Sequence, residues 1–235
     1  MKKSLLIAMA VSVASISQAQ LVITSFGSDF ESNNGYSLGP IDGQLGWGGS
    51  TGAEISDVRS QSGSQSLRMT DEAAAWFNYD PDETGSFIGG VSLYIEGGTA
   101  NPDINYGIAA FNNGNGSVFD LGVSGSGDIR AGWGSGILSP IIGSVSNHTD
   151  RWLDLQFQYT TGSTTMNITV DGQNFTVTDL PGLDISSLQL IAAPLNSNSS
   201  PAATAYFDDS YFEAVPEPAT IVGASLLGAF VLRRR

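Results

Sequence analysis

Residues 152–177 read WLDLQFQYTTGSTTMNITVDGQNFTV, and this stretch decides the fold class. From residue 153 to residue 159 apolar side chains alternate with Asp and Gln, and the alternation resumes in residues 166–170. Alternation with a period of two is typical of a β-strand with one face in the core. Asp171-Gly172 suits the two left-handed positions of a type I′ turn, so a return strand around Phe175 and Val177 should pair antiparallel with its predecessor.

The rest of the central part of the chain repeats this pattern in shorter runs. Apolar stretches are separated by Gly, Ser and Asn, and no segment between the termini predicts a helix. Many short strands divided by turns predict an all-β protein, an antiparallel sandwich of two sheets. The alternation in residues 91–96 predicts a half-buried strand. The further strands are predicted at residues 26–31, 53–58, 65–69, 73–79, 91–96, 106–111, 118–123, 188–192 and 205–214.

The end of the chain has three segments of different chemistry, which are Pro216-Glu217-Pro218, an uncharged apolar run over residues 219–232, and Arg233-Arg234-Arg235. As a helix, the apolar run would reach about 21 Å, against about 30 Å for a bilayer core. It predicts a short transmembrane helix with the arginines on the cytoplasmic side. The alternative is a buried helix or a frayed end of a soluble domain, but a core helix would be amphipathic.

These three segments resemble the PEP-CTERM sorting signal of Gram-negative bacteria. The resemblance covers residues 215–235 and rests on Pro216-Glu217-Pro218, the apolar segment and the basic end. It implies that an exosortase, an integral-membrane enzyme, recognises the tripeptide and processes the tail. It also implies passage through the inner membrane to the cell surface or extracellular matrix, with a link to exopolysaccharide or biofilm. It says little about the activity of the rest of the chain.

The start of the chain has the three parts of a secretory signal peptide. Lys2-Lys3 is the positive region, residues 5–16 are apolar, and Ser17-Gln18-Ala19 offers small side chains to signal peptidase. We expect cleavage after Ala19, so that residues 1–19 are the signal peptide and residues 20–214 the exported domain. An uncleaved membrane anchor is the alternative.

Charge and composition narrow the choice of partners. The chain has 23 acidic and 9 basic residues, a formal net charge of −14 and no cysteine. Five of the basic residues lie in the two terminal segments, so the body is more acidic than the whole chain. Nucleic acids and anionic lipid surfaces attract clustered Lys and Arg, so we expect neither as a partner of the body. Divalent cations and neutral glycans are compatible with this charge, which can also serve solubility alone.

Three further segments resemble the carbohydrate-binding jelly rolls: Asp29-Phe30-Glu31, residues 62–67 and Tyr206-Phe207-Asp208-Asp209. The hairpin of residues 152–177 is similar to the related concanavalin-A-type lectin and glucanase sandwich. The resemblance implies that the two sheets are connected as a jelly roll. It further implies a structural calcium ion (Ca²⁺) shared by Glu31 and Asp208 or Asp209, with loop carbonyls near residues 62–64.

Calcium also has a physical argument of its own. Carboxylates on adjacent strands repel one another, and an oxygen-binding cation removes that repulsion. A chain without cysteine has no disulfide, so it would gain stability from a bound ion. The alternative is that Asp208 and Asp209 are solvated residues at the edge of a sheet.

Motifs for catalysis are weak. The Glu-x-Asp-x-x-Glu strand of jelly-roll glucanases has no counterpart; the nearest approaches are Asp29-x-Glu31 and residues 80–83, which we expect in a turn beside Pro81. The single histidine, His148, has no nucleophile motif around it. We therefore predict a non-catalytic protein. Two acids from distant segments could still form a glycosidase pair, so a secreted glucanase-like enzyme is the alternative.

Two tryptophans lie in glycine-rich segments, Trp47 in Leu-Gly-Trp-Gly and Trp133 in Ala-Gly-Trp-Gly. Sugar rings stack on exposed aromatic faces, so both are candidate glycan contacts, and packing in or around the core is the alternative for each. The sequence as a whole predicts an exported surface or matrix protein whose sandwich binds a glycan or another protein, or has a structural role.

Overall fold

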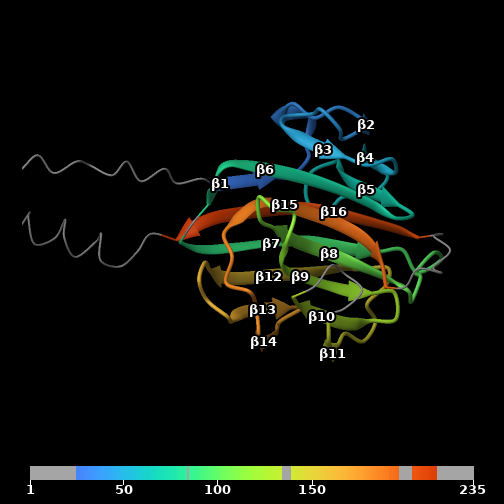
Figure 1. Ribbon diagram of the computed structural model, residues 1–235. Helices are drawn as coiled ribbons and strands as arrows, with labels where there is room; N and C mark the ends of the chain where they lie inside the picture. The colour runs from blue at the N-terminus through green and yellow to red at the C-terminus, as the bar shows by residue number, and fades with distance from the viewer. Residues whose placement is uncertain (1–24, 84, 134–138, 196–202, 216–235) are drawn as a thin grey trace, which may run out of the picture.

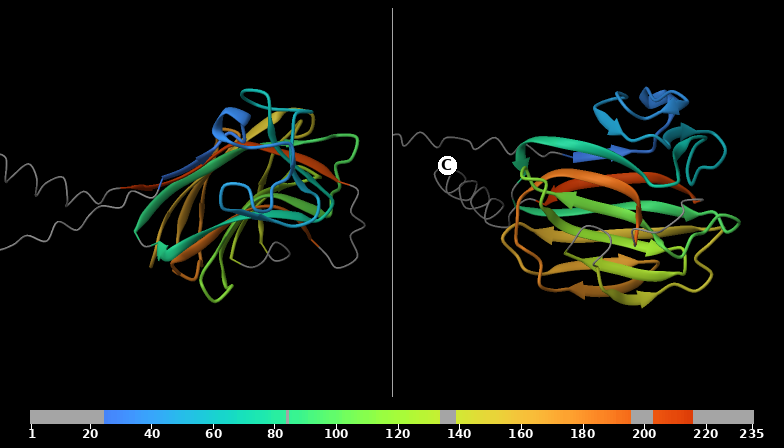
Figure 2. Two further views of the ribbon diagram at one scale, coloured as in Figure 1. Left: turned by 90° about the horizontal axis from the view of Figure 1, so that it is seen from above. Right: turned by 45° about the vertical axis from the view of Figure 1, so that its right-hand side comes forward.

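The computed structural model describes residues 25–83, 85–133, 139–195 and 203–215, which form two stacked antiparallel β-sheets (Figure 1, Figure 2). The predicted all-β sandwich of two antiparallel sheets is therefore confirmed. Within these ranges, a 3-10 turn at Ser32–Asn34 is the one helical element. The strands are β1 (Ser25–Ser28), β2 (Gly39–Pro40), β3 (Trp47–Gly49), β4 (Ala53–Ser56), β5 (Ser66–Thr70), β6 (Ala73–Glu83), β7 (Ser86–Ile95), β8 (Ile104–Phe111), β9 (Ser117–Ser124), β10 (Asp128–Gly132), β11 (Ile141–Ser144), β12 (Trp152–Thr160), β13 (Met166–Val170), β14 (Gln173–Val177), β15 (Ile185–Pro194) and β16 (Thr204–Val215).

The chain crosses repeatedly between the two sheets. Sheet A runs in the order β14-β13-β12-β7-β16-β5-β4-β2, and β1 also pairs with β16. Sheet B runs in the order β11-β10-β9-β8-β15-β6-β3. The successive strands β6, β7 and β8 lie in sheets B, A and B, and β14, β15 and β16 lie in A, B and A. These crossings tie both sheets to one core.

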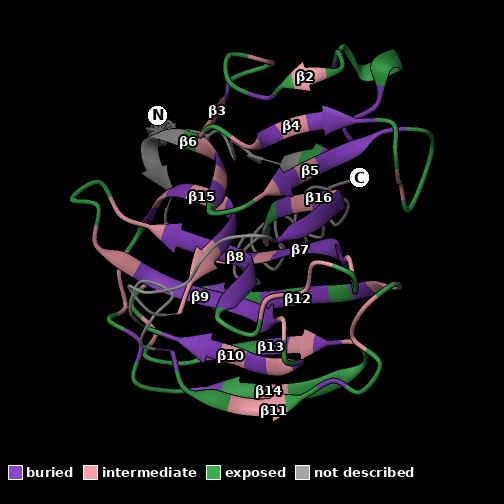
Figure 3. Ribbon diagram, turned by 90° about the vertical axis from the view of Figure 1, so that its right-hand side faces the viewer, coloured by how far each residue is buried: buried purple, intermediate pink, exposed green. Residues whose placement is uncertain are grey.

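The core lies between the sheets and follows the alternation seen in the sequence. Along β12 the side chains alternate between buried and exposed from Leu153 to Thr160. Figure 3 shows the buried residues concentrated in the central strands, while β11 and β14 are largely exposed. The turn between β13 and β14 has a φ of 48° at Asp171 and 77° at Gly172, so the predicted type I′ turn has both of its positive φ values.

The structure departs from the predicted strands at several places. The predictions omit β2, β3, β10 and β11, because these runs are short and contain Gly or Pro without clear alternation. The predicted first strand ends early, at Ser28, and Phe30 takes a left-handed φ of 56°. Residues 80–83 belong to β6 rather than to a turn. Within the described ranges, β3 pairs with β6 only at residues 75–77 of β6. Pro81 lies beyond the end of β3, so on that side its missing N–H group costs no hydrogen bond.

Strand β7 is buried on both faces, although its alternation predicts one solvated face. Ser92 and Tyr94 on its outer face are only 7% and 5% exposed. The strand lies between β12 and β16, and the guanidinium group of Arg59 covers the Tyr94 ring at 4.0 Å from the centroid. The cover comes from a loop distant in sequence, which a local pattern does not encode.

The predictions for the two ends of the chain lie outside the described residues. They concern the signal peptide at residues 1–19, the tripeptide at 216–218, the transmembrane segment at 219–232 and the arginines at 233–235. Val215 is described and is the last residue of β16. Within the described ranges, no helix has the length and apolar character needed to cross a bilayer.

Two adjacent glycines in β7, Gly89 and Gly90, let large side chains approach this central strand from both sides. A Cβ atom on Gly89 would lie 2.6 Å from the ring of Phe157, which is buried in the core. A Cβ atom on Gly90 would lie 2.9 Å from Cε1 of Tyr211. Real Cβ atoms essentially never approach other atoms within 3.0 Å, so packing requires both glycines.

We expect Gly89→Ala to lower the free energy of unfolding by about 1–3 kcal/mol, because the added methyl group overpacks against Phe157. Urea denaturation of the purified protein measures the change. Gly98→Ala is the matched control, since no atom lies within 4 Å of its Cβ position. Equal stability of the two variants would contradict the packing argument.

Candidate functional site

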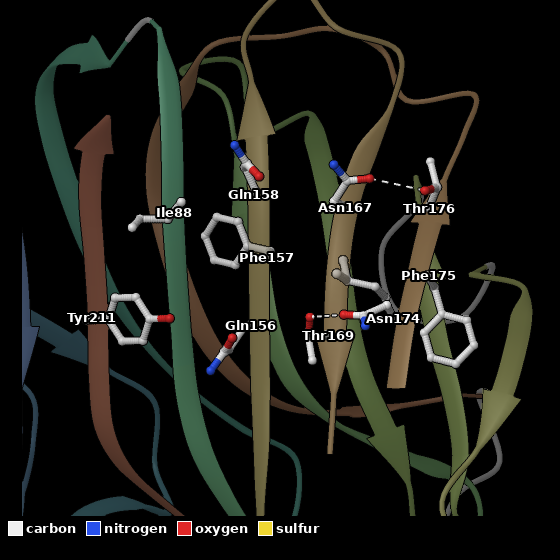
Figure 4. Close-up of a pocket in the computed structure, with 11 residues that line it drawn as sticks. Ile88, Gln156, Phe157, Gln158, Asn167, Thr169, Asn174, Phe175, Thr176 and Tyr211 are labelled. Atoms are coloured by element: carbon white, nitrogen blue, oxygen red, sulfur yellow. Dashed lines mark hydrogen bonds between the residues drawn. The ribbon is translucent and has the colours of Figure 1, made fainter. Parts of the chain in front are cut away.

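The outer face of sheet A carries two adjacent rows of mostly polar side chains that cross the strands (Figure 4). The rows follow from the register, because residues paired across antiparallel strands project on the same side of the sheet. Five strands contribute in the order β14, β13, β12, β7 and β16. The first row is Asn174, Thr169, Gln156, Gly90 and Tyr211, and the second is Thr176, Asn167, Gln158, Ile88 and Glu213.

All residues of these rows except Gly90 and Glu213 line a hollow on the surface of the sheet. Its volume is about 560 Å³. A second hollow of about 270 Å³ adjoins it and adds Ser92, Asp154 and Asp209. The two share Gln156 and Tyr211, so we treat them as one feature, the outer groove, made of the two rows and these three residues. Clefts that bind ligands have volumes of this order.

A β-bulge in β16 places Tyr211 in the outer groove. Asp208 pairs with Ser92 and Tyr211 pairs with Gly90, so β16 has one residue more than β7 between the two pairs. Asp209 accommodates the extra residue with a left-handed φ of 48°. Regular pairing would place Ser210 opposite the glycine, and the bulge puts an aromatic ring there instead.

Tyr211 presents an aromatic face and a neutral hydroxyl group to the groove. The Cβ position of Gly90 lies 2.9 Å from Cε1 and 3.1 Å from the hydroxyl oxygen of Tyr211, so the ring extends across β7. Burial and the nearby carboxylates of Glu213 and Asp154 raise the pKa of Tyr211, so its hydroxyl group stays protonated. A half-buried tyrosine of this kind suits a ligand with one apolar and one polar side.

Paired hydroxyl and amide groups orient the side chains at the β13–β14 end of the groove. Thr169 Oγ1 donates a hydrogen bond to Asn174 Oδ1 at 2.7 Å, and Thr176 Oγ1 donates one to Asn167 Oδ1 at 3.1 Å (Figure 4). Each asparagine thereby keeps its Nδ2 group available as a donor. The two hydrogen bonds limit the rotation of these side chains before any ligand arrives, which reduces the ordering cost of binding.

The middle of the groove holds amide groups that are not engaged. Gln156 and Gln158 are exposed, and within the described ranges their side chains make no hydrogen bond to the protein. An amide both donates and accepts, as the hydroxyl group of a sugar does. The groove can therefore exchange hydrogen bonds in both directions with a polyhydroxylated ligand.

The loop of residues 59–65, which we call the clamped loop, is fastened by the acids of the predicted metal site. Fully buried Asp208 accepts hydrogen bonds at Oδ2 from the backbone N–H groups of Gln61 at 2.8 Å and Ser62 at 3.1 Å. The hydroxyl group of Ser62 donates to Asp209 Oδ1 at 2.6 Å. The loop is thus held directly beside the bulge that positions Tyr211.

Glu31 fastens the other end of the clamped loop. Its Oε1 accepts hydrogen bonds from the N–H groups of Ser64 at 2.6 Å and Gln65 at 2.7 Å, and its Oε2 accepts one from Ser64 Oγ at 2.9 Å. Charge-assisted hydrogen bonds of this type are stronger than neutral ones. The structure therefore brings Glu31, Asp208 and Asp209 to one loop, as the resemblance to jelly rolls implies.

The described residues do not fit a calcium ion between these acids. Calcium takes six to eight oxygen ligands. Oε1 of Glu31 and Oδ2 of Asp208 each already accept two N–H groups, and N–H groups would repel a cation. Within the described ranges, no group of three or more His, Cys, Asp or Glu residues has a metal-binding arrangement. Calcium stays a prediction from the sequence, while the contacts show the carboxylates holding a loop.

The two anchoring carboxylates have pKa values shifted in opposite directions. Burial raises the pKa of Asp208 to about 6, although hydrogen bonds from backbone N–H groups act to lower it. Burial acts to raise the pKa of Glu31 as well, but there the N–H groups of Gln65 and Ser64 and the Ser64 hydroxyl group outweigh it, and the pKa is lowered. Both groups are therefore ionised at neutral pH, with Asp208 the nearer to protonation.

The two predicted aromatic contacts lie apart from the outer groove. Trp47 is 4% exposed, its Nε1 donates to the Tyr36 hydroxyl group at 2.9 Å, and its ring packs against Phe30 and Phe77. Trp47 is therefore a core residue and presents no face to a ligand. Trp133 is 58% exposed and follows β10 of sheet B, so it remains a candidate contact on another part of the surface.

Of the residues of the outer groove, only Asp209 is a candidate site residue from the sequence, and there as a calcium ligand. One signal was available, the repeated Asn-x-Thr spacing of residues 167–169 and 174–176 on two strands that the predicted turn joins. It places four polar side chains on one face. No such signal marks Tyr211, because the bulge at Asp209 changes which residue of β16 faces outward.

Comparison with known proteins bears on the fold alone. No family model and no curated protein matches the chain. Similar solved structures include a sialidase, with a TM-score of 0.53 and 11% identity over 72% of this chain and 17% of that one. They also include botulinum neurotoxin type C, whose passage into cells depends upon interaction with two ganglioside molecules, with a TM-score of 0.52 and 10% identity over 81% of this chain and 50% of that one.

The binding domain of botulinum neurotoxin serotype C1 is a third similar structure, with a TM-score of 0.50 and 12% identity over 75% of this chain and 46% of that one. This chain thus spans half or less of the length of each of these three proteins. At such low identities the likeness shows a shared β-sandwich fold and carries no site residues across.

If hydrogen bonds rather than an ion hold the clamped loop, EGTA should leave the melting temperature unchanged. Glu31→Gln should lower the free energy of unfolding by about 1–3 kcal/mol, because it replaces charge-assisted hydrogen bonds with neutral ones and puts an NH2 donor where Oε2 accepts the Ser64 hydroxyl group. Calorimetry measures both effects, with Asp103→Asn at an exposed loop as the control. A fall in melting temperature with EGTA, seen in the wild type and lost in Glu31→Gln, would instead establish a calcium site.

Asp208 should make the protein more stable as the pH falls from about 7 to about 4. Its pKa is about 6 in the folded protein and 3.8 in the unfolded chain, so the folded state binds more protons over this interval and the free energy of unfolding rises. Glu31 acts with the opposite sign, since its lowered pKa means that its contribution is lost as the pH falls below about 4.5. Urea titrations at pH 7, 6 and 5 should show the rise in the wild type and not in Asp208→Asn. Parallel pH profiles for the two proteins would contradict this assignment.

Proposed function

We propose that this protein is an exported, non-catalytic glycan-binding module, and that the outer groove of sheet A is its binding site. The observation that carries the proposal is the position of Tyr211, whose ring extends over Gly90 beside the exposed amides of Gln156 and Gln158. Sugar rings combine an apolar C–H face with a rim of hydroxyl groups. An aromatic face flanked by amides matches both.

The fold is compatible with this proposal. The similar structures include a sialidase and a toxin described as interacting with gangliosides, so proteins of this sandwich fold include some that act on or interact with sugars. A shared fold by itself does not carry function. The weight of the proposal therefore rests on the groove, whose polar side chains come from five neighbouring strands.

We propose further that the two ends of the chain determine where the module is displayed. Signal peptidase would remove residues 1–19, and an exosortase would recognise Pro216-Glu217-Pro218 after export. The apolar residues 219–232 and the arginines at 233–235 would hold the protein in the inner membrane before processing. The mature protein would then reach the cell surface or extracellular matrix, where exopolysaccharide or envelope glycan is the proposed partner.

A binding assay with purified polysaccharides tests the site. Tyr211→Ala should weaken binding by about tenfold or more, because it removes the aromatic platform, and Gln156→Ala by about two- to tenfold, the effect of one or two hydrogen bonds. The matched control is Gln189→Ala, since Gln189 lines a separate hollow on sheet B. Affinity electrophoresis measures the dissociation constants. Equal loss in all three variants, or loss only in Gln189→Ala, would place the site elsewhere.

The same incubations test the alternative of a secreted glycan-active enzyme. Release of reducing sugar from any of the polysaccharides measures hydrolysis. Turnover that a single carboxylate substitution abolishes would replace the non-catalytic proposal with an enzymatic one.

A further inference from the structure

We infer that the outer groove binds the interior of an uncharged polysaccharide chain and excludes acidic glycans. The inference rests on the proposed glycan-binding function and adds the class of ligand to it. Three observations carry it: the sign of the charges in the groove, the engagement of the arginines elsewhere, and the length and open ends of the two rows.

The charged side chains of the groove are all acidic. Asp154 and Glu213 are exposed and Asp209 is half-buried, and all three lie around Tyr211. Among the described residues that line the two hollows there is no lysine or arginine. A carboxylate or sialic acid group on a ligand would therefore meet like charges and find no cation to pair with.

The arginines of the described ranges do not line the groove, and each contacts another part of the protein. Arginine side chains recognise acidic sugars by pairing with the carboxylates of the sugars. The positions of the arginines therefore decide whether the groove can bind an acidic glycan. Arg59 covers Tyr94 and lies 4.0 Å from Glu96, Arg68 pairs with Glu54 at 2.8 Å, Arg130 donates to the Ser139 carbonyl at 3.0 Å, and Arg151 pairs with Asp171 at 2.6 Å.

Uncharged sugar hydroxyl groups suit the groups that are present. The amides of Gln156 and Gln158 offer donors and acceptors, and Asn167 and Asn174 offer oriented Nδ2 donors. Exposed carboxylates accept hydrogen bonds from hydroxyl groups without needing a countercharge. Binding that depends on such bonds should vary little with ionic strength, in contrast to binding through charge pairs.

The geometry of the rows indicates a chain rather than a single sugar. Five strands contribute, and four spacings of about 4.8 Å give a row about 19 Å long. At one end lies β14, the last strand of sheet A in the described ranges. At the other end Tyr211 pairs with Gly27, an exposed residue without a side chain to block the row. A groove open at both ends admits the middle of a polymer, which would lie across the strands.

Affinity electrophoresis and calorimetry with two sets of probes test the inference. The neutral set is an unbranched β-glucan, dextran and galactomannan, and the acidic set is polygalacturonate, alginate and a polysialic acid. We expect at least one neutral polymer to bind, with affinity changing less than twofold between 50 and 500 mM salt, and every acidic polymer to bind at least tenfold more weakly. Oligosaccharides of the bound polymer should compete only from about four sugar units upward.

Two double variants separate the repulsion of acidic polymers by the groove from the effect of a change in net charge. Asp154→Asn with Glu213→Gln should raise the ratio of acidic to neutral polymer binding several-fold. Asp103→Asn with Glu72→Gln makes the same change of charge at exposed residues outside the groove and should leave the ratio unchanged.

The outcomes distinguish the inference from the function on which it rests. Acidic polymers that bind as well as neutral ones, with binding lost in Gln156→Ala, would overturn the inference and leave a glycan-binding groove. A monosaccharide that competes as well as a tetramer would overturn the assignment of a chain interior. No binding by either set of polymers would overturn the proposed function itself.

Discussion

The two glycines at the centre of sheet A are the constraint on which the rest of the structure depends. Gly89 admits the Phe157 ring to the core, and Gly90 admits the Tyr211 ring to the outer face. One strand thereby takes an aromatic ring on each side at the same level. This arrangement also requires the bulge at Asp209, because the bulge changes the register of β16 by one residue and turns Tyr211 outward.

The clamped loop connects this centre to the buried acids. Glu31 lies three residues after the end of β1 and Asp208 lies inside β16, and both accept hydrogen bonds from backbone N–H groups of the loop. A buried carboxylate costs free energy unless hydrogen bonds compensate it, and here the loop supplies them. The acids and the loop thus stabilise each other through hydrogen bonds. The loop in turn stands beside the bulge, so the order of the groove and the order of the loop are linked through Asp208 and Asp209.

The charged side chains around the groove are acidic. Asp154, Asp209 and Glu213 lie around Tyr211, while Arg68 and Arg151 form ion pairs with residues outside the groove. The sialidase and the botulinum neurotoxin have similar β-sandwiches. Their sequences are only 11% and 10% identical to this chain, so the side chains on the sheets differ. The proposed ligand class therefore rests on the side chains of this chain and not on the shared fold.

The sequence by itself determined the fold class, the hairpin at residues 152–177 and its type I′ turn, because these depend on local alternation and on the left-handed preference of Asp-Gly. The resemblance to jelly rolls also implied that Glu31 and Asp208 or Asp209 share a calcium ion, which stays a prediction. The tertiary structure decided what those acids do, since their partners Gln61, Ser62, Ser64 and Gln65 lie far from them along the chain. It likewise buried Trp47 and brought Tyr211, Gln156 and Asn174 into one row. A row across a sheet depends on register and bulges between distant strands, and no local pattern of residues specifies these.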